Sequence, residues 1–549
     1  MKGDFEMLKL TDEGLKDRKA WEEKGYHLPQ YDRAAMKKET EENPVWVHFG
    51  AGNIFRAFQA NAMQKLLEKG DVKAGITAVD GFDYEIISKN YRPHNNLSVL
   101  VTLKADGTVD KTVIGSIGET VILDSNDEKE YSRMKEIFTK DSLQMATFTI
   151  TEKGYALTDA SGKTLPAIEE DVKNGIEKPQ SYMGKIVSLL YARYKAGEKP
   201  IAMVSNDNCS RNGEKLYQAV DGVARMFLEN GKVEQGFIDY IENDKKVSFP
   251  WTMIDKITPR PDKSVEEILE KDGLDLTPAE TSRHTFIAPF VNSEETEYLV
   301  IEDDFPNGRP HLEDAGFYFT DRETVNKVER MKVNTCLNPL HTALAVFGCL
   351  LGYTKISDEM KDADLVNLVK TIGYKEGLPV VTDPKILNPK EFIDTVVNVR
   401  IPNPFMPDTP QRIATDTSQK LSVRYGETIK SYLADPKLNV QDLKLIPLVQ
   451  AGWIRYLMGV NDNGEPFEIS PDPLLEELKP YVDGLTLGNV PSADDLKKRL
   501  LPLLKNEKIF GVDLEKAGLS DRVLGYFSEL IAGKGAVRAT LHKYAGDAE

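Results

Sequence analysis

Cysteine is scarce in this sequence, and its placement argues against two kinds of site. Only three of the 549 residues are cysteines, namely Cys209, Cys336 and Cys349. They form neither a metal-ligand spacing nor a disulfide framework. We therefore predict no metal site, and the simplest compartment for the chain is a reducing cytoplasm.

Long apolar runs and an excess of basic charge are also missing. No stretch approaches the roughly 18 apolar residues that cross a bilayer, and residues 1–40 contain no apolar core of signal-peptide length. The net charge is −18 and the pI is near 5.1. An acidic surface repels phosphate backbones, so we expect no membrane and no nucleic acid as partner. An anionic small substrate still fits a local basic pocket.

The chain is long enough for more than one core. Its 549 residues predict two or three domains. Short apolar strands alternate with helices up to about residue 320, and the pattern is mainly helical from Glu323 onward. We therefore place a domain boundary near residue 320, while nothing in the sequence specifies an oligomeric state.

A β-turn-α pattern begins at Val45. A short apolar strand ends at Phe49, and the turn Gly50-Ala51-Gly52 leads into a helix with apolar residues at helical spacing. Glycines at such a turn let the backbone approach a pyrophosphate, whose charge the helix N-terminus stabilises. The G-x-G-x-x-G pattern is incomplete because Phe55 holds the third glycine's place, so a simple tight turn is the alternative. The candidate cofactor-binding residues are Gly50, Gly52, Asn53, Ile54, Phe55 and Arg56.

A second strand ends in an acidic residue, Asp80. An acid at that position binds the adenosine ribose hydroxyls and favours NAD over NADP. Asp83 competes for this role, and a turn aspartate before Gly81 is an equally good interpretation of Asp80.

Polar segments follow two later apolar strands. Thr151 and Glu152 come after the first, and Asn208 comes after the second. The carboxyl ends of strands line the ligand crevice in a doubly wound sheet, so Asn208 is placed to hold a reacting oxygen; a turn-forming asparagine is the alternative. Asp255 lies in a short apolar, proline-punctuated segment, and a solvated acid beside Lys256 is the alternative there.

The stretch K-V-N-T-C-L-N-P-L-H places an amine, a carboxamide and an imidazole within ten residues, Lys332 to His341. Asn338 and His341 are three apart and share one face of a helix. A buried lysine beside such groups is a candidate proton donor and acceptor, because desolvation lowers its pKa. The structural alternative is a solvated Lys332, an Asn338 N-cap with Pro339 at the first helical position, and a core histidine.

A second polar cluster contains three cations, Arg400, Arg412 and Lys420. Arginine offers a planar donor fork and lysine a point charge, so the cluster suits an anionic or polyhydroxylated substrate. Ion pairs with Asp408 and Asp416 are the alternative.

Seven segments carry a family resemblance. They are H-F-G-A-G-N-I-F-R-A from His48, T-E-K-G-Y from Thr151, S-N-D-N-C-S-R-N-G from Ser205, M-I-D-K-I-T-P from Met253, the stretch from Lys332 to His341, R-I-A-T-D-T-S-Q-K from Arg412, and A-G-W-I-R-Y-L-M-G from Ala451 followed by Asp472-Pro473. In this order they resemble the polyol-specific long-chain dehydrogenases, the family of mannitol 2-dehydrogenase, fructuronate reductase (mannonate oxidoreductase) and tagaturonate reductase. The resemblance runs through roughly residues 45–480.

The resemblance implies an α/β fold with two domains. A Rossmann-type doubly wound dinucleotide-binding domain is expected in residues 1–320, and a mainly α-helical substrate and catalytic domain in residues 321–549, with the active site between them. It also implies metal-independent, NAD-dependent interconversion of a secondary alcohol and a ketone.

The resemblance further implies the roles of individual residues. Lys332 is the expected general acid/base, and Asn208 and Asn338 are expected to hydrogen-bond the reacting oxygen. His341 would position the substrate and orient Lys332, and Glu329 would pass protons to solvent. Arg412 and Lys420 look like substrate binders, and Asp255 lies where the family has an active-site acid. Arg400 is added as a substrate-binding candidate from the cation cluster.

One feature of the central stretch departs from the family. Six residue steps separate Lys332 from Asn338, where the family usually has five. On one regular helix the extra residue turns Lys332 away by about 100°. We predict that either a π-bulge absorbs the residue, or Pro339 starts a new helix capped by Asn338.

The clustered cations and the N-P-L-H variant favour a ketohexuronate and its aldonate, of the D-fructuronate/D-mannonate type, as the substrate pair. Tagaturonate reductase and mannitol 2-dehydrogenase activities are the alternatives. A nucleotide-binding regulatory protein on this fold is the non-enzymatic alternative.

Overall fold

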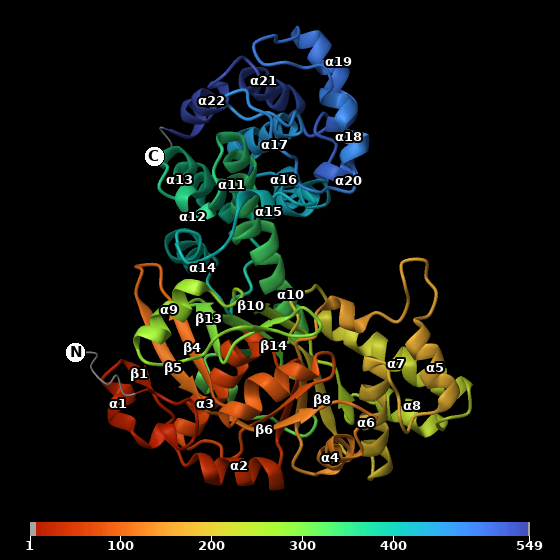
Figure 1. Ribbon diagram of the computed structural model, residues 1–549. Coiled ribbons are helices and arrows are strands. Elements are labelled where there is room, and N and C mark those ends of the chain that lie inside the picture. Colours follow the sequence, from red (N-terminus) through yellow and green to blue (C-terminus); the bar gives the residue numbers. More distant parts are fainter. Residues whose placement is uncertain (1–6, 547–549) are drawn as a thin grey trace, which may run out of the picture. The chain divides into compact units, whose positions relative to one another are not determined.

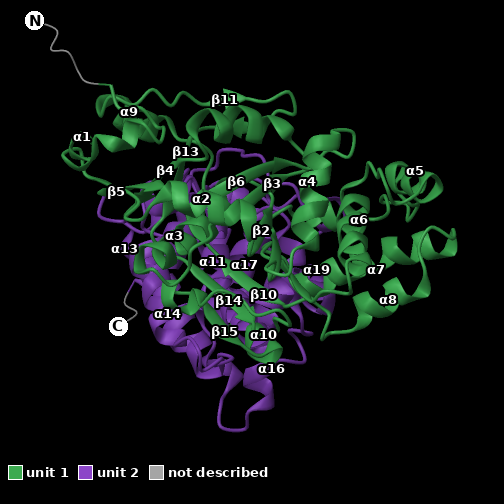
Figure 2. Ribbon diagram, turned by 90° about the horizontal axis from the view of Figure 1, so that it is seen from below, with its two compact units in different colours: residues 1–104, 108–325 green, residues 105–107, 326–549 purple. Residues whose placement is uncertain are grey.

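The computed structural model describes residues 7–546 of the chain. They form two compact units (Figure 2): unit 1 comprises residues 7–104 and 108–325, and unit 2 comprises residues 105–107 and 326–546. The chain passes from the first unit to the second within helix α10 (Arg322–Met331). The boundary expected near residue 320 lies at the end of strand β15 (Tyr318–Thr320), just before this helix.

Unit 1 contains a six-stranded sheet in which all neighbouring strands are parallel. Its spatial order is β6-β3-β2-β7-β8-β9, which reads 3-2-1-4-5-6 when the strands are numbered along the chain. This is the strand order of the Rossmann fold, so the predicted fold class is confirmed. The strands are β2 (Trp46–Phe49), β3 (Ile76–Asp80), β6 (Ile117–Ile122), β7 (Met145–Phe148), β8 (Ile201–Ser205) and β9 (Val247–Ser248).

This sheet is buried on both faces, as a parallel sheet requires. Successive side chains of a strand point to opposite faces, so Val47 and Phe49 pack into one core and Trp46 into the other. Residues of helices α4 (Glu128–Thr139), α6 (Tyr182–Lys195), α7 (Asn212–Glu229) and α8 (Gln235–Glu242) complete the first core (Figure 1). Helix α3 (Ala60–Lys69) contributes to the second core.

Two smaller sheets join the second core. Strands β4 (Ser98–Leu103) and β5 (Val109–Ile114) form a hairpin around Gly107 and extend into a sheet of order β1-β5-β4-β13. The chain then turns at Gly115 and Ser116, between β5 and β6, to enter the parallel sheet.

The remaining elements of unit 1 connect these sheets. The strands are β1 (Tyr26–His27), β10 (Thr252–Asp255), β11 (Ala279–Glu280), β12 (Phe286–Ile287), β13 (Phe290–Glu294) and β14 (Tyr298–Glu302). The other small sheet of the second core is formed by β10, β14 and β15, and β11 pairs with β12. The helices are η1 (Gly14–Lys16), α1 (Arg18–Glu22), α2 (Arg33–Glu42), η2 (Phe55–Gln59), η3 (Ile86–Tyr91), η4 (Arg92–His94), η5 (Glu152–Tyr155), α5 (Pro166–Asn174), α9 (Lys263–Lys271) and η6 (Leu312–Ala315).

Unit 2 is helical, and its described residues contain no β-strand. Its core is formed by α11 (Asn338–Leu351) and α17 (Leu445–Tyr456), and every residue of α17 is buried. At Gly452 an added Cβ would lie 3.0 Å from Phe347, so glycine lets the two helices approach closely. The predicted helical C-terminal half is confirmed.

The other helices of unit 2 surround this pair. They are η7 (Lys332–Cys336), α12 (Ile356–Glu359), α13 (Ala363–Lys370), η8 (Thr371–Gly377), η9 (Leu378–Val380), α14 (Pro389–Thr395), η10 (Val396–Arg400), α15 (Pro410–Ile413), η11 (Thr417–Gln419), η12 (Ser422–Gly426), α16 (Glu427–Ala434), η13 (Val440–Asp442), α18 (Leu475–Val482), α19 (Ala493–Leu504), α20 (Glu507–Phe510), α21 (Ser520–Leu530) and α22 (Ala536–Ala545). No helix within residues 7–546 is both long and apolar enough to span a membrane.

Candidate active site

The glycine turn follows β2, at the centre of the Rossmann sheet. Gly50 has φ +100°, and an added Cβ would lie only 2.1 Å from the Thr149 carbonyl oxygen at the end of β7. A side chain is therefore excluded there. Gly52 is different, because an added Cβ would meet nothing within 4 Å. The backbone at Gly52 is thus open to a close approach by a phosphate group.

Phe55 explains why this turn does not need a third glycine. It begins the π-helix η2 and is fully buried. Its ring stacks on the imidazole of His48, with centroids 4.1 Å apart and planes 8° from parallel. His48 contacts the Thr147 hydroxyl at 2.6 Å and the Thr149 hydroxyl at 2.9 Å, so it ties β2 to β7. Burial lowers the pKa of His48 to about 3, and the ring is neutral.

Asp80 ends β3 and braces the glycine turn. Its carboxylate accepts hydrogen bonds from the backbone N–H groups of Ala51 at 3.3 Å, Phe82 at 2.9 Å and Asp83 at 2.8 Å. Burial raises the pKa of Asp80. The competing acid, Asp83, accepts a hydrogen bond from the Thr281 hydroxyl at 2.6 Å. Asp80 is therefore the acid that contacts the turn directly.

Arg56 holds the turn from the other side. Its guanidinium donates to the Asn53 side chain at 2.8 Å, to the Ser98 hydroxyl at 2.9 Å and to the Ala288 carbonyl at 2.7 Å. Only 2% of Arg56 is exposed, and burial lowers its pKa. Ile54 packs against the second core of unit 1. Arg56 and Ile54 thus fix the turn, and its open surface is backbone.

The segment after β7 is strained and held by one buried carboxylate. Thr151 has φ +64°, a left-handed conformation that is unusual for a threonine. Asp207 accepts hydrogen bonds from the N–H groups of Thr151, at 2.8 Å, and of the residue before it, at 3.1 Å, and also from the Tyr155 hydroxyl. Glu152 is exposed and paired with Lys215. Strain of this kind often marks a functional segment.

Asn208 lies in the loop after β8. Neighbouring residues anchor this loop: the Gln59 side chain donates to Asn206 at 3.2 Å, and the Asn212 side chain donates to the Thr252 hydroxyl at 2.8 Å. Asn206 and Asn212 are buried, whereas Asn208 is exposed. The loop is therefore fixed at both ends and presents Asn208 outward.

Asp255 is not a solvated loop acid. It is the last residue of β10, paired in register with Tyr298 of β14, and only 6% exposed. The neighbouring Lys256 instead pairs with Glu297 at 2.9 Å. The loop-acid alternative is therefore wrong, because Asp255 is buried and belongs to a strand.

Lys332 begins a π-helical turn. The Leu337 N–H donates to the Lys332 carbonyl at 3.1 Å, five residues back, within η7 (Lys332–Cys336). A π-turn accommodates one residue more than an α-turn, so it absorbs the extra residue as predicted. Helix α11 then starts anew, with Pro339 in its first turn, but its N-cap is Leu337 and not Asn338. Lys332 is only 6% exposed, so the solvated-lysine alternative is wrong.

His341 lies one turn into α11 among several charges. Burial lowers its pKa to about 4; the Asp408 carboxylate opposes this shift, and the guanidiniums of Arg400, Arg424 and Arg412 add to it. The imidazole is therefore neutral near pH 7. Three guanidiniums against one carboxylate leave its surroundings positively charged.

The predicted cations are engaged to different degrees. Arg412 pairs with Asp408, so this part of the ion-pair alternative is confirmed. Lys420 donates to the Thr415 carbonyl, and burial, with help from the Arg424 charge, lowers its pKa. Arg400 is only 5% exposed.

Arg424 was missed by the sequence analysis. It donates to the hydroxyl of Thr342, the residue after His341. The available signal was its spacing, since Arg424 follows Lys420 by four residues and so lies on the same helical face.

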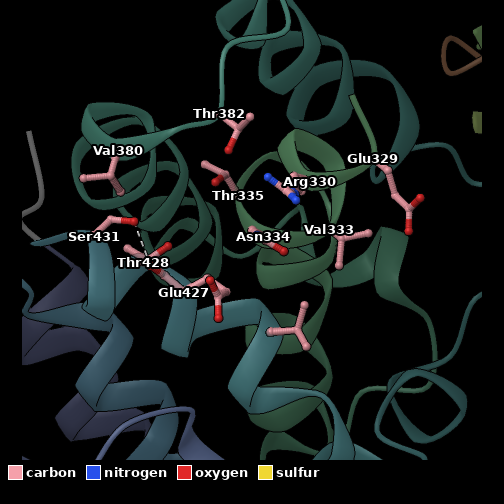
Figure 3. Close-up of a pocket in the computed structure, with 11 residues that line it drawn as sticks. Glu329, Arg330, Val333, Asn334, Thr335, Val380, Thr382, Glu427, Thr428 and Ser431 are labelled. Carbon is pink, nitrogen blue, oxygen red and sulfur yellow. Dashed lines mark hydrogen bonds between the residues drawn. The ribbon is translucent and has the colours of Figure 1, made fainter. Parts of the chain in front are cut away.

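Glu329 lines a cavity of about 520 Å³ in unit 2 (Figure 3). The other lining residues are Arg330, Val333, Asn334, Thr335, Val380, Thr382, Val423, Glu427, Thr428 and Ser431. Glu329 thus lies at the edge of a cavity with mostly polar lining side chains. Within residues 7–546 no group of three or more His, Cys, Asp or Glu side chains is arranged to hold a metal ion.

Two family comparisons cover most of the chain. The mannitol dehydrogenase Rossmann domain matches residues 45–314, and the mannitol dehydrogenase C-terminal domain matches residues 324–529. The chain belongs to the mannitol dehydrogenase family. It is thus an oxidoreductase, and the resemblance identified from the seven segments is confirmed.

Individual relatives of this family match over nearly the whole chain. A D-mannonate oxidoreductase of Thermotoga maritima is 52% identical over 542 residues, covering 98% of this chain and 99% of that protein. A polyol:NADP oxidoreductase of Gluconobacter oxydans is 27% identical, and the match covers 93% of this chain and 96% of that protein. Among solved structures, the chain is similar to a mannitol 2-dehydrogenase of Pseudomonas fluorescens in a ternary complex with NAD and D-mannitol. The TM-score is 0.66 at 25% identity, and the match covers 98% of this chain and 100% of that one.

The candidate residues of this mannitol dehydrogenase family member divide between the units. The glycine turn, Asp80, Thr151, Asn208 and Asp255 belong to unit 1, whereas Glu329 and the later candidates belong to unit 2. Within unit 2 the structure brings His341 together with Arg400 and Arg412.

Proposed function

We propose that this protein is an NAD(H)-dependent oxidoreductase that interconverts a ketohexuronate and its aldonate, of the D-fructuronate/D-mannonate type. The observation that carries the proposal is the 52% identity, over nearly both full lengths, to a D-mannonate oxidoreductase. The positive surroundings of His341 add support, because both sugar acids carry a carboxylate that a hexitol lacks.

The glycine turn of unit 1 suits the cofactor. We assign its pyrophosphate to the backbone at Gly50 and Gly52 and to the helix start from Asn53 to Arg56. The space next to Gly52 supports this assignment. Thr151 and Glu152, after the adjacent strand β7, would line the same crevice. When bound, the nicotinamide carries the hydride of the reaction.

Asp80 is proposed to select NAD over NADP. Its carboxylate already accepts three backbone N–H groups. A carboxylate has about four acceptor positions, so one remains for a ribose hydroxyl. A 2′-phosphate at that position would place negative charge beside the buried acid, which is unfavourable.

Lys332 is proposed as the general acid/base. Ketone reduction leaves negative charge on oxygen, and a protonated lysine in a largely buried position can neutralise that charge by donating its proton. The carboxamides of Asn208 and Asn338 would donate hydrogen bonds to the same oxygen. His341, neutral near pH 7, can accept a hydrogen bond from the ammonium and so orient it. Glu329 would pass the proton onward through its open cavity.

Substrate binding is assigned to four further side chains. Arg400, Arg412 and Lys420 supply positive charge and N–H donors for the sugar acid. Asp255 would accept hydrogen bonds from sugar hydroxyls.

A substrate panel tests the proposal. NADH and NADPH oxidation would be followed with D-fructuronate, D-tagaturonate and D-fructose. We expect the highest kcat/KM with D-fructuronate and NADH. Preference for D-tagaturonate would instead indicate a tagaturonate reductase, and preference for D-fructose a mannitol 2-dehydrogenase, the activity of the Pseudomonas fluorescens neighbour. No turnover with any ketone would indicate a nucleotide-binding regulatory protein.

A further inference from the structure

Arg424 is held firmly against the start of α11. It belongs to the π-helix η12, and its Nη1 group donates to the Thr342 hydroxyl, which itself donates to the Asn338 carbonyl at 3.0 Å. The next residue, Tyr425, is fully buried and donates to the Pro339 carbonyl at 2.6 Å. Two neighbouring residues of one turn thus fix the guanidinium beside the segment that carries Asn338 and His341.

The charge of Arg424 lacks a counter-ion. No carboxylate among residues 7–546 forms an ion pair with it, whereas Arg412 is paired with Asp408. Burial lowers the pKa of Arg424 to about 10, so the group stays protonated at neutral pH. Its charge also contributes to the lowered pKa of Lys420. Desolvating a guanidinium is costly unless an acid or several hydrogen-bond acceptors compensate. Arg56 has no acidic partner but donates to three oxygens, whereas Arg424 donates to one hydroxyl.

Arg424 also keeps hydrogen-bonding capacity. A guanidinium has five N–H donors in a planar fork, and only Nη1 donates to a described residue. The edge formed by Nε and Nη2 is the edge that binds a carboxylate through two parallel hydrogen bonds. Lys420, by contrast, already donates to the Thr415 and Ile413 carbonyls.

We propose that Arg424 binds the carboxylate of the substrate and so makes the enzyme prefer a sugar acid to a polyol. This inference rests on the proposed function and deepens it. The missing counter-ion is then supplied by the substrate, and the Arg424–Thr342 contact sets the carboxylate's position relative to His341. Arg412, whose charge is paired with Asp408, and Lys420, which donates to two backbone carbonyls, would contact the rest of the sugar chain.

Arg424→Leu tests this role with a pair of ketones that differ in charge. D-Fructuronate carries the carboxylate, and D-fructose does not. We expect kcat/KM for D-fructuronate to fall about 100-fold, as when one partner of a desolvated charge pair is removed. The value for D-fructose should stay within about threefold of the wild type, because a neutral substrate makes no ion pair. Arg424→Lys should recover part of the loss, since it keeps the charge but not the fork.

Controls separate binding from folding. Lys437→Leu removes one exposed cation from the same unit, outside the ion pairs of the described residues, and should leave both kcat/KM values unchanged. Thermal unfolding and NADH affinity should be the same in all variants. An equal loss with both ketones in Arg424→Leu would indicate a structural role, and full retention of D-fructuronate activity would also overturn the inference.

A binding measurement keeps this test separate from that of the proposed function. D-Mannonate should raise the unfolding temperature of the wild type more than D-mannitol does, and Arg424→Leu should remove that difference. If the wild type does not reduce D-fructuronate, the proposed function fails. If D-mannonate raises the unfolding temperature of the wild type no more than D-mannitol does, the inference about Arg424 fails, whatever the outcome of the activity assay.

Discussion

Two buried glutamates of unit 2 differ in their hydrogen bonds, and this difference predicts opposite effects of Glu→Gln substitution on stability. Glu359 is fully buried at the end of α12, and neither of its carboxyl oxygens has a hydrogen-bond partner among residues 7–546. It packs against α11 at Gly348, where an added Cβ would lie 2.2 Å from its Oε1 atom. Glu376 is 3% exposed, but its carboxylate accepts the N–H groups of Lys444, Leu445 and Ile446 at 2.7 to 2.8 Å.

The magnitude for Glu359 follows from proton linkage. Burial raises the pKa of Glu359 well above its usual value of 4.5, and the nearby Asp362 charge adds to this shift. Above pH 4.5 the folded chain therefore keeps a proton on Glu359 that the unfolded chain has released. Stability therefore falls by about 1.4 kcal/mol per pH unit between the unfolded and folded pKa values. Glu359→Gln removes this slope, because an amide does not titrate.

The assay is denaturant unfolding of wild type, Glu359→Gln and Glu376→Gln at several pH values from 5 to 8. The stability of Glu359→Gln relative to wild type should rise steadily with pH. Glu376→Gln should instead be less stable by about 2 to 3 kcal/mol, because both carboxyl oxygens accept N–H groups at the start of α17 and an amide nitrogen cannot. Parallel pH curves for wild type and Glu359→Gln would refute the reasoning about Glu359.

Further predictions concern the cofactor turn. Gly50→Ala should destabilise unit 1 by about 1 to 3 kcal/mol, because the methyl group meets the Thr149 carbonyl at a positive φ; thermal unfolding measures this. Gly52→Ala should leave unfolding unchanged yet weaken NADH binding at least tenfold by titration, since its Cβ projects into open space; unchanged affinity would contradict the assignment. Asp80→Asn should lower the ratio of kcat/KM with NADH to that with NADPH, and an unchanged ratio would remove Asp80 from cofactor selection.

Local patterns in the sequence predicted the central part of the unit 1 sheet. The apolar strand before Gly50 and the acid at Asp80 correctly indicate two strands of a Rossmann sheet, because strand length and turn chemistry are local properties. The sequence alone did not explain Phe55 at the third glycine position. In the structure its ring stacks on His48 of the preceding strand, and two threonines about 100 residues away hold the His48 imidazole.

Unit 2 shows where local reasoning stops. The extra residue after Lys332 predicted either a π-turn or a new helix capped by Asn338, since helical geometry leaves few ways to absorb it, and the structure has the π-turn. The partners of Arg424 were not predictable, because Thr342 is 82 residues distant in the chain. The same holds for Asp207, whose hold on Thr151 joins two loops 56 residues apart. Contacts between distant segments position these side chains, and the spacing of residues in the sequence does not predict such contacts.

The central claim is that Lys332 exchanges the proton of the reaction. Its most direct test is the single-turnover rate of D-fructuronate reduction by Lys332→Ala preloaded with NADH. The account predicts a loss of about 1,000-fold or more, with NADH affinity unchanged and part of the rate recovered by added alkylamines. A rate within tenfold of the wild type would assign the proton to another group.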